Sequence, residues 1–139
     1  MIDLVRLAPQ HLRDMRLQDN QVAFGARFTD DFLEALAKTN AWTLMRHGEP
    51  VGCAGVAEID GFKNYAWAFL GESIGRQMLT ATRACADMLS GYTSDVFTHC
   101  RMDVPANARW LKLLGFEPTG TRDVLPDGMT YELWVRKHV

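Results

Sequence analysis

The spacing of apolar residues changes at Ser73 from the alternation of strands to the three- and four-residue steps of a helix. A strand is predicted before this point, from Tyr65 to Leu70, and another after the helix, from Ser94 to Met102. The helix ends at Gly91, and its apolar face consists of Ile74, Met78, Leu79, Thr82, Cys85, Ala86 and Leu89. A strand–helix–strand step requires a parallel strand pair with a right-handed crossover. We therefore expect a cleft where that pair separates.

The other segments predict antiparallel strands and three further helices. Strands are expected at Ile2 to Leu7, Ala41 to Arg46, Val51 to Glu58, Phe116 to Val124 and Met129 to Lys137. Helices are expected from Pro9 through Leu17, from Thr29 to Lys38, and from Asp103 to Leu114. Either Thr29 or Asp30 could cap the second of these helices. Together they predict one α/β (α+β) domain over residues 1–139. Its mixed sheet would have six to seven mostly antiparallel strands, with helices on both faces.

The composition limits the partners of such a domain. The chain has 139 residues and a formal net charge of -2. Its Lys and Arg residues are scattered, and binding to nucleic acid needs a concentrated basic face. No apolar run approaches the roughly 20 residues that cross a bilayer, and the amino terminus lacks the pattern of a signal peptide. We expect no nucleic-acid partner, no membrane insertion and no secretion by a signal peptide.

Three single cysteines, Cys53, Cys85 and Cys100, lie in apolar stretches of the sequence. An odd number without a CxxC pair argues against both a disulfide framework and a zinc site. We expect reduced thiols in the core of a protein made in a cytoplasm, and no metal.

The segment Asn107-Ala108-Arg109-Trp110-Leu111-Lys112-Leu113-Leu114-Gly115-Phe116 resembles a segment of the GNAT superfamily of acyl-CoA-dependent N-acetyltransferases. In that family a helix ends in a Gly-Phe pair before the last hairpin. Glycine takes the left-handed turn at the helix end, and phenylalanine re-enters the core. The order of the predicted elements resembles that family too. This resemblance implies a GNAT-like fold and acetyl-CoA as the ligand.

A narrower resemblance covers most of the chain after residue 40. It is to a small group of tailed-phage proteins with this fold, some called internal virion protein A and others acetyltransferase-like. The matching runs are Ala41-Trp42-Thr43, Gly48-Glu49-Pro50, Gly55-Val56-Ala57, Trp67-Ala68-Phe69-Leu70-Gly71, Met88-Leu89 with Tyr92, and Arg109-Trp110-Leu111 before Leu114-Gly115-Phe116. The resemblance implies a phage or prophage origin, a place in the host cytoplasm or the virion, and a virion or host protein as partner. It leaves the number of subunits open.

Binding of acetyl-CoA requires free backbone N–H groups at a helix start, which hold the pyrophosphate. In active relatives the motif is Arg or Gln, then x-x-Gly-x-Gly or Ala. The family's spacing back from Gly115 places this motif at Glu72 to Gln77, where only Gly75 is retained.

The other side chains of this segment depart from the family's pattern. Glu72 would bring negative charge beside a diphosphate, and Gln77 would crowd the backbone there. Arg76 or Arg83 could compensate as a side-chain ligand of phosphate. The candidate acetyl-CoA-binding residues are Phe69, Leu70, Gly71, Gly75, Arg76 and Asn107.

Acetyl transfer also needs a base for the amine, and the departing thiolate benefits from an acid. The family's tyrosine acid corresponds to Leu111 here, which has no proton to give, and its asparagine falls on Val104. Candidate bases are Glu58, Glu72 and His99, each of which could instead be structural or solvated. No motif selects among them.

Two hypotheses about function remain. The first is a phage-type GNAT-fold protein with a degenerate acetyl-CoA site that is virion-associated or acts by docking onto proteins. The second is an active acetyl-CoA-dependent N-acetyltransferase acting on a protein or small-molecule amine, so the sequence leaves open whether the chain is an enzyme. Most aromatic side chains should be core, whereas a surface cluster would mark a docking patch. The aromatic residues concerned are Trp42, Phe62, Tyr65, Trp67, Trp110 and Trp134.

Overall fold

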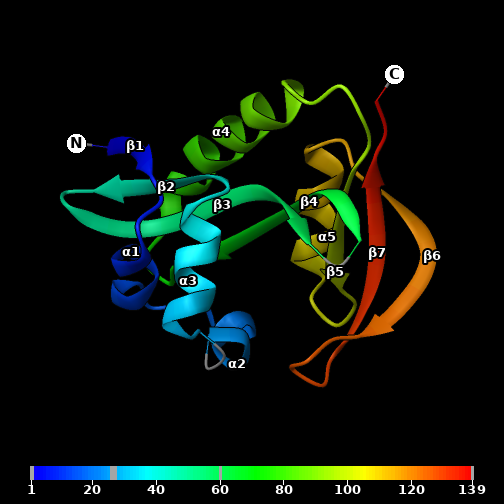
Figure 1. Cartoon of the computed structure of the whole chain (residues 1–139), viewed down its shortest axis with the longest axis horizontal. Coiled ribbons are helices and arrows are strands. Elements are labelled where there is room, and N and C mark those ends of the chain that lie inside the picture. Colours follow the sequence, from blue (N-terminus) through cyan, green and yellow to red (C-terminus); the bar gives the residue numbers. More distant parts are fainter. Residues whose placement is uncertain (1, 26–27, 60, 139) are drawn as a thin grey trace. The chain divides into compact units, whose positions relative to one another are not determined.

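The computed structural model of the chain describes residues 2–25, 28–59 and 61–138. Its strands form one sheet in the order β1-β2-β3-β4-β5-β7-β6 (Figure 1). The strands are β1 (Ile2–Arg6), β2 (Asn40–Arg46), β3 (Glu49–Ile59), β4 (Phe62–Leu70), β5 (Val96–Arg101), β6 (Glu117–Val124) and β7 (Thr130–Arg136). The helices are α1 (Pro9–Asp14), α2 (Val22–Gly25), α3 (Asp30–Ala37), α4 (Met78–Ser90) and α5 (Pro105–Leu113), with 3-10 turns η1 (Asp19–Gln21) and η2 (Gly75–Gln77).

The predicted mixed sheet is confirmed, with seven strands. β4 and β5 pair in parallel, at Tyr65 with Phe97. The pairs β1–β2, β2–β3, β5–β7 and β6–β7 are antiparallel. The strand–helix–strand step inferred from the change of period at Ser73 is therefore present as β4, α4 and β5.

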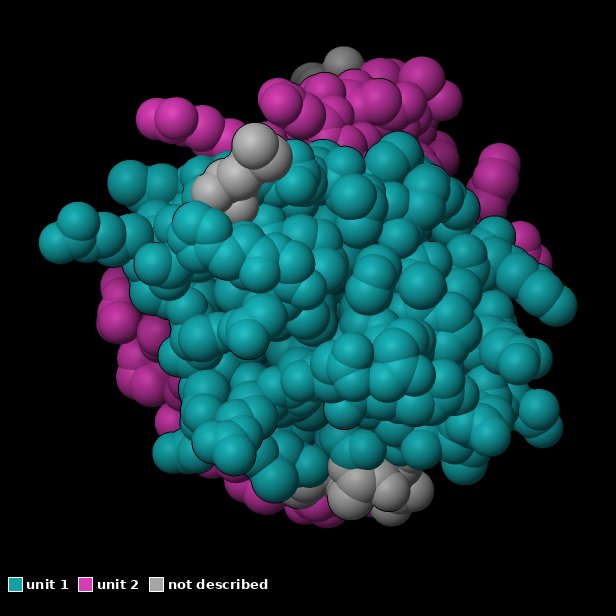
Figure 2. Space-filling model, turned by 90° about the vertical axis from the view of Figure 1, so that its left-hand side faces the viewer, with its two compact units in different colours: residues 1–57, 67–81 teal, residues 58–66, 82–139 magenta. Residues whose placement is uncertain are grey.

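The chain divides into two compact units, coloured teal and magenta in Figure 2. Unit 1 consists of Met1–Ala57 and Trp67–Ala81, and unit 2 consists of Glu58–Ala66 and Thr82–Val139. The single domain over residues 1–139 stays a prediction. None of the helices in the described residues has the length and apolar character needed to cross a membrane.

Unit 1 packs helices on both faces of its strands. On one face, α1 and α3 contribute to a buried cluster of Leu7, Leu12, Met15, Leu33, Leu36, Ala41, Cys53 and Phe69. On the other face, the start of α4 covers a smaller cluster of Leu44, Val51 and Ile74, joined by Leu70, Met78 and Ala81. Because side chains alternate between the faces of a strand, Ala41 and Leu44 of β2 fall in different clusters. Thr29 caps α3 by accepting the N–H of Phe32 at 3.1 Å, as the sequence predicts.

A histidine joins α1 to β2 within unit 1. Nδ1 of His11 accepts the backbone N–H of Ala8 at 3.1 Å and lies 2.8 Å from Oγ1 of Thr43, whose side chain is fully buried. Since Nδ1 accepts the Ala8 N–H, it carries no proton, and the Thr43 hydroxyl donates to it. Burial lowers the pKa of His11 and outweighs the opposite effect of Asp14.

Lowering the pH from about 7.5 to 5.5 is therefore expected to destabilise the chain through His11. The unfolded state binds the proton more readily, so the stabilisation is complete above the ordinary histidine pKa of about 6.5 and is lost as the pH falls. Protonation of Nδ1 breaks the hydrogen bond from the Ala8 N–H, because both groups are then donors, at a cost of about 1 kcal/mol. Urea unfolding at both pH values should show a larger loss for the wild type than for His11→Gln. An equal loss in the two proteins would contradict this assignment.

Unit 2 carries its described helices on one face of β5 and β7. Arg136 of β7 reaches both helices, because its Nη1 donates to the Leu89 carbonyl and its Nε to the Leu114 carbonyl, each at 3.1 Å. Val96 lies opposite Arg136 in the register, so alternate residues of β5 starting at Val96 face the helices. The opposite face is formed by the other residues of β5, which are Phe97, His99 and Arg101.

The end of α5 follows the sequence prediction. Gly115 has a left-handed φ of +91°, and the N–H of Phe116 donates back to the Leu111 carbonyl at 3.0 Å. Phe116 is 4% exposed. The Gly-Phe pair therefore ends the helix and returns the chain to the core, and this prediction is confirmed.

The long helix begins later than the sequence predicts. α4 starts at Met78, whereas the helical spacing predicts a start at Ser73. Gly75 has φ +45°, a left-handed conformation that cannot continue an α-helix, so residues 75–77 form only a 3-10 turn.

Other predicted boundaries are wrong by smaller amounts. α1 ends at Asp14, because the next residue, Met15, has an extended backbone, and Leu17 pairs with Gly71. β4 begins at Phe62, three residues before the predicted start at Tyr65. Helix α2 and turn η1 are not predicted by the apolar spacing.

Candidate functional site

The loop between β4 and α4 lies within unit 1 and begins at Gly71. The N–H of Gly71 donates to the Val51 carbonyl at 2.9 Å, and a Cβ at Gly71 would lie 2.9 Å from the same oxygen. A side chain at this position would force the backbone apart. Gly71 is therefore required to hold the start of the loop against the sheet.

Three backbone N–H groups of this loop have no protein acceptor among the described residues, namely those of Ser73, Gly75 and Arg76. The N–H groups between and after them are used, since Ile74 donates to Gly71 at 3.2 Å and Gln77 donates to Ile74 at 2.8 Å. All three residues are exposed. Free N–H groups immediately before the 13-residue α4 form an arrangement that binds anions, helped by the helix dipole.

The acidic side chain of this loop has a cationic neighbour. Nη1 of Arg16 lies 3.5 Å from Oε1 of Glu72, and the N–H of Glu72 donates to the Arg16 carbonyl at 2.7 Å. Both side chains are exposed, so the pair contributes little to stability. It nevertheless reduces the repulsion between Glu72 and an anion at the loop. Arg76 is exposed in the same loop, whereas Arg83 is an exposed residue of unit 2.

The two predicted ligand residues at the end of β4 have structural partners. Phe69 is buried, with its ring 4.9 Å from that of Phe28. The N–H of Leu70 donates to Oε1 of Gln21 at 2.7 Å, and its carbonyl accepts the N–H of Gln18 at 2.9 Å. The strand end thus positions the loop, and a direct role of Phe69 and Leu70 in binding acetyl-CoA stays a prediction.

His99, a predicted base, is linked to two side chains on the face of β5 opposite the helices of unit 2. Its Nδ1 lies 2.7 Å from the Tyr65 hydroxyl of β4, and its Nε2 lies 3.1 Å from Oδ2 of Asp123 of β6. The His99 side chain is 11% exposed, and that of Asp123 is 47% exposed. Glu58, in contrast, is an exposed residue at the end of β3.

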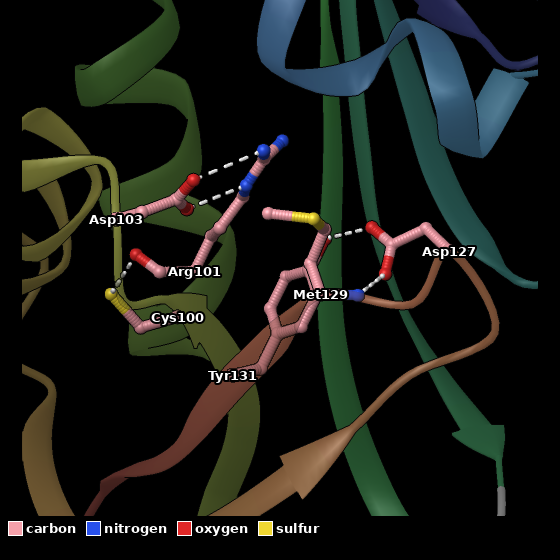
Figure 3. A network of polar contacts seen from close by, with 6 residues as sticks. All are labelled: Cys100, Arg101, Asp103, Asp127, Met129 and Tyr131. Carbon is pink, nitrogen blue, oxygen red and sulfur yellow. Dashed lines mark hydrogen bonds and ion pairs between the residues drawn. The ribbon is translucent and has the colours of Figure 1, made fainter.

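A second network of polar contacts in unit 2 includes Arg101 of β5 and Tyr131 of β7 (Figure 3). Arg101 donates to both carboxylate oxygens of Asp103, at 2.7 Å and 3.2 Å, and this pairing raises the pKa of Arg101 and lowers that of Asp103. Asp127 accepts the Tyr131 hydroxyl at 2.5 Å and the Met129 N–H at 2.9 Å. Burial, together with the Asp127 carboxylate, raises the pKa of Tyr131. Tyr131 is therefore a hydrogen-bond donor that holds the β6–β7 turn.

The remaining predicted residues lie on or near α5 in unit 2. Leu111, at the position of the family's acid, is a core residue with 8% exposure. Val104 precedes the first turn and supplies no side-chain cap, and Asn107 is half-buried within α5. Within residues 2–25, 28–59 and 61–138, no three His, Cys, Asp or Glu side chains lie close enough to hold a metal ion.

An open pocket of about 430 Å³ lies in unit 2 beside the start of β5. Its lining residues are Lys63, Asn64, Thr93, Ser94, Asp95, Phe97 and His138. None of the residues predicted for acetyl-CoA binding or for catalysis belongs to it, so it carries no functional assignment.

The cysteines are free thiols in apolar surroundings. Burial raises the pKa of Cys53, and it raises the pKa values of Cys85 and Cys100 to about 11. Only about one thousandth of such a thiol is ionised at pH 8, and the thiolate is the reactive form. Ellman's reagent at pH 8 should therefore react with the folded chain roughly a hundredfold more slowly than with the urea-unfolded chain. Rapid labelling of one thiol in the folded chain would contradict this placement.

Sequence reasoning missed Tyr65, Asp123 and Arg16 as site residues. Tyr65 is predicted only as one of several aromatic residues that lie in the core or in a surface cluster, and the two charged residues carry no motif. The predicted parallel strand pair could have pointed to Tyr65, because it places Tyr65 and His99 on neighbouring strands.

No protein-family model matches the sequence, and no curated protein matches it. Solved structures do match it over nearly its whole length. An N-acetyltransferase from Staphylococcus aureus Mu50 superposes with a TM-score of 0.75 at 8% identity, covering 100% of this chain and 99% of the other. The chain has the GNAT fold.

Two further GNAT-fold structures show the same similarity. A protein from Bordetella pertussis described as a GnaT-family acetyltransferase has a TM-score of 0.71 and 18% identity, over 97% of this chain and 94% of its own. Aminoglycoside acetyltransferase AAC(6')-Ib in complex with coenzyme A has a TM-score of 0.66 and 17% identity, over 99% and 95%. In the GNAT fold of this chain, the loop with free N–H groups precedes α4, where the sequence resemblance places the family's pyrophosphate motif.

Proposed function

We propose that the chain is an acetyl-CoA-dependent N-acetyltransferase acting on a protein or small-molecule amine. The observation that carries this proposal is the set of unpaired N–H groups at Ser73, Gly75 and Arg76, ahead of α4 in a GNAT fold. The similar solved structures include complexes with coenzyme A and with acetyl-CoA.

The loop suits a diphosphate although its side chains depart from the family's motif. Backbone N–H groups supply the hydrogen bonds, so the loss of the motif's side chains leaves these donors in place. Arg16 lies beside Glu72, and the exposed Arg76 adds a second cation to the loop. The positively charged end of α4 further favours a bound anion.

The proposed reaction transfers the acetyl group from sulfur to nitrogen. The amine nitrogen attacks the thioester carbonyl carbon, the C–N bond forms and the C–S bond breaks. The amine gives one proton to water and the departing thiolate takes one from water, so no net proton is gained or lost. Because Leu111 has no proton to give, we assign the protonation of the thiolate to water.

The transfer is tested by incubating the purified chain with acetyl-CoA and, separately, spermidine, an aminoglycoside and a lysine-containing peptide. We expect at least one amine to raise the release of free coenzyme A thiol above the amine-free and protein-free blanks. Mass spectrometry should find one acetyl group on that amine. Saturable acetyl-CoA binding without release in the presence of these amines would support a binding role and contradict transfer to them.

A second candidate function is docking by a phage-type GNAT-fold protein with a degenerate acetyl-CoA site. The observation that favours it is the burial of Leu111, because a core residue occupies the place of the family's acid. Association with a virion or with a host protein is part of this candidate. If docking is the function, millimolar acetyl-CoA should give neither heat of binding nor release of thiol.

A further inference from the structure

Tyr65, His99 and Asp123 form a continuous chain of hydrogen bonds across one face of unit 2. They come from β4, β5 and β6, and β7 lies between β5 and β6 in the sheet (Figure 1). The Tyr65 hydroxyl lies 2.7 Å from Nδ1 of His99, and Oδ2 of Asp123 lies 3.1 Å from Nε2. Both nitrogens of the imidazole are thus occupied, and the ring orientation is fixed.

The direction of these hydrogen bonds follows from the chemistry of the groups. An ionised carboxylate can only accept, so Nε2 of His99 donates to Asp123. In the neutral imidazole Nδ1 is then the acceptor, and the Tyr65 hydroxyl donates to it. If the tyrosine proton moves to Nδ1, the imidazolium that forms lies against the Asp123 carboxylate. This is the arrangement of a nucleophile, a base and a residue that orients the base.

The surroundings of Tyr65 are aromatic. The ring of Phe62 lies 5.8 Å from that of Tyr65 and 5.2 Å from that of Phe97, and the ring of Tyr131 lies 6.4 Å from that of His99. Tyr65 is half-buried. Flat aromatic groups pack favourably against such rings, through offset or edge-to-face contacts.

We propose that Tyr65, His99 and Asp123 form a hydroxyl-activating triad that takes the acyl group of small aryl esters. The Tyr65 oxygen attacks the ester carbonyl carbon, its proton passes to His99 Nδ1, and the bond from carbonyl carbon to aryl oxygen breaks. His99 gives the proton to the departing aryloxide, which leaves as a phenol. Water then attacks the acyl-tyrosine with His99 as base, which releases the carboxylic acid and restores the Tyr65 hydroxyl. Tyr65 is the catalytic nucleophile, and His99 is the catalytic base. Asp123 is a positioning residue that orients His99.

This activity goes beyond the proposed function, because it needs no coenzyme A and uses residues of unit 2 alone. It is tested on the full chain with p-nitrophenyl acetate at pH 7.5, by following release of p-nitrophenolate and by mapping the acetyl group with peptide mass spectrometry. In the wild type the acetyl group should be found on Tyr65 and, relative to Tyr65, at most one tenth as often on Tyr92 or Tyr131. When the reaction is stopped with acid within the first turnover, acetylation elsewhere with Tyr65 unmodified overturns the proposal without the use of any variant.

The variants separate the roles of the three residues. Tyr65→Phe and His99→Gln should each lower the rate at least tenfold, and Asp123→Asn should lower it while Asp123→Glu restores part of it. Tyr92→Phe is the matched control, because Tyr92 lies in the segment between α4 and β5 and belongs neither to the triad nor to the rings described around it, and it should stay within about twofold of the wild type. An unchanged rate for folded Tyr65→Phe overturns the triad. That result leaves the proposed acetyltransferase unaffected, since acetyl-CoA is absent from the assay.

Discussion

Replacing Trp134 with alanine is expected to lower the free energy of unfolding by about 3–5 kcal/mol. Trp134 is 4% exposed and lies on β7 opposite Thr98 of β5, which is also buried. Removing the indole leaves a cavity between strands and helices of unit 2 that the neighbouring side chains cannot fill without moving. Denaturant unfolding followed by far-ultraviolet circular dichroism measures the loss.

Trp134→Phe is the matched control for this cavity. The indole Nε1 of Trp134 is buried and has no hydrogen-bond partner in the described part of the chain. Phenylalanine therefore fills much of the volume while removing an unsatisfied donor, which offsets part of the lost packing. We expect a cost of about 1 kcal/mol for this variant. A loss equal to that of the alanine variant would show that the indole nitrogen has a partner.

Introducing a carboxylate at Gly75 is expected to weaken acetyl-CoA binding about 30-fold. Gly75 has φ +45°, and a Cβ built there meets nothing within 4 Å, so a side chain has room. Aspartate tolerates the left-handed conformation better than most residues. Its negative charge would lie beside the bound diphosphate, at a cost of about 2 kcal/mol at the partly screened surface of the loop. Isothermal titration calorimetry measures the change.

Gly75→Asn isolates the charge from the bulk of the new side chain. Asparagine has nearly the same shape as aspartate and the same tolerance of the left-handed backbone. It should therefore weaken binding much less than aspartate does, and the difference between the variants should shrink as salt is added. Equal affinities for the two variants at low salt would mean that no phosphate lies near Gly75.

Periodicity predicted the order of the main strands and helices because burial imposes a regular spacing on apolar residues. The change of period at Ser73 located the strand–helix–strand step, and Gly115 with Phe116 located the end of α5. The start of α4 was wrong because a single backbone angle, φ of +45° at Gly75, decides where the α-helix begins. Apolar spacing does not report on that angle.

The contacts of His99 could not be predicted because they depend on strand register. Tyr65 precedes His99 by 34 residues, and Asp123 follows it by 24. A register shift of one residue in β4 or β6 would turn Tyr65 or Asp123 to the other face of the sheet. The free N–H groups of the loop could not be predicted either. The side chains of the loop depart from the family's motif and so suggested a degenerate site, whereas the hydrogen-bond donors belong to the backbone. The phage origin and the virion partner stay predictions of the sequence resemblance.

The central claim is that the free N–H groups at Ser73, Gly75 and Arg76 hold the diphosphate of acetyl-CoA. Calorimetric titration of the wild-type chain with acetyl-CoA, and in parallel with acetylpantetheine, tests it most directly because only the first ligand carries the diphosphate. We expect saturable one-to-one binding of acetyl-CoA and at least tenfold weaker binding of acetylpantetheine. Absence of heat with millimolar acetyl-CoA, or equal affinities for the two ligands, would contradict the claim.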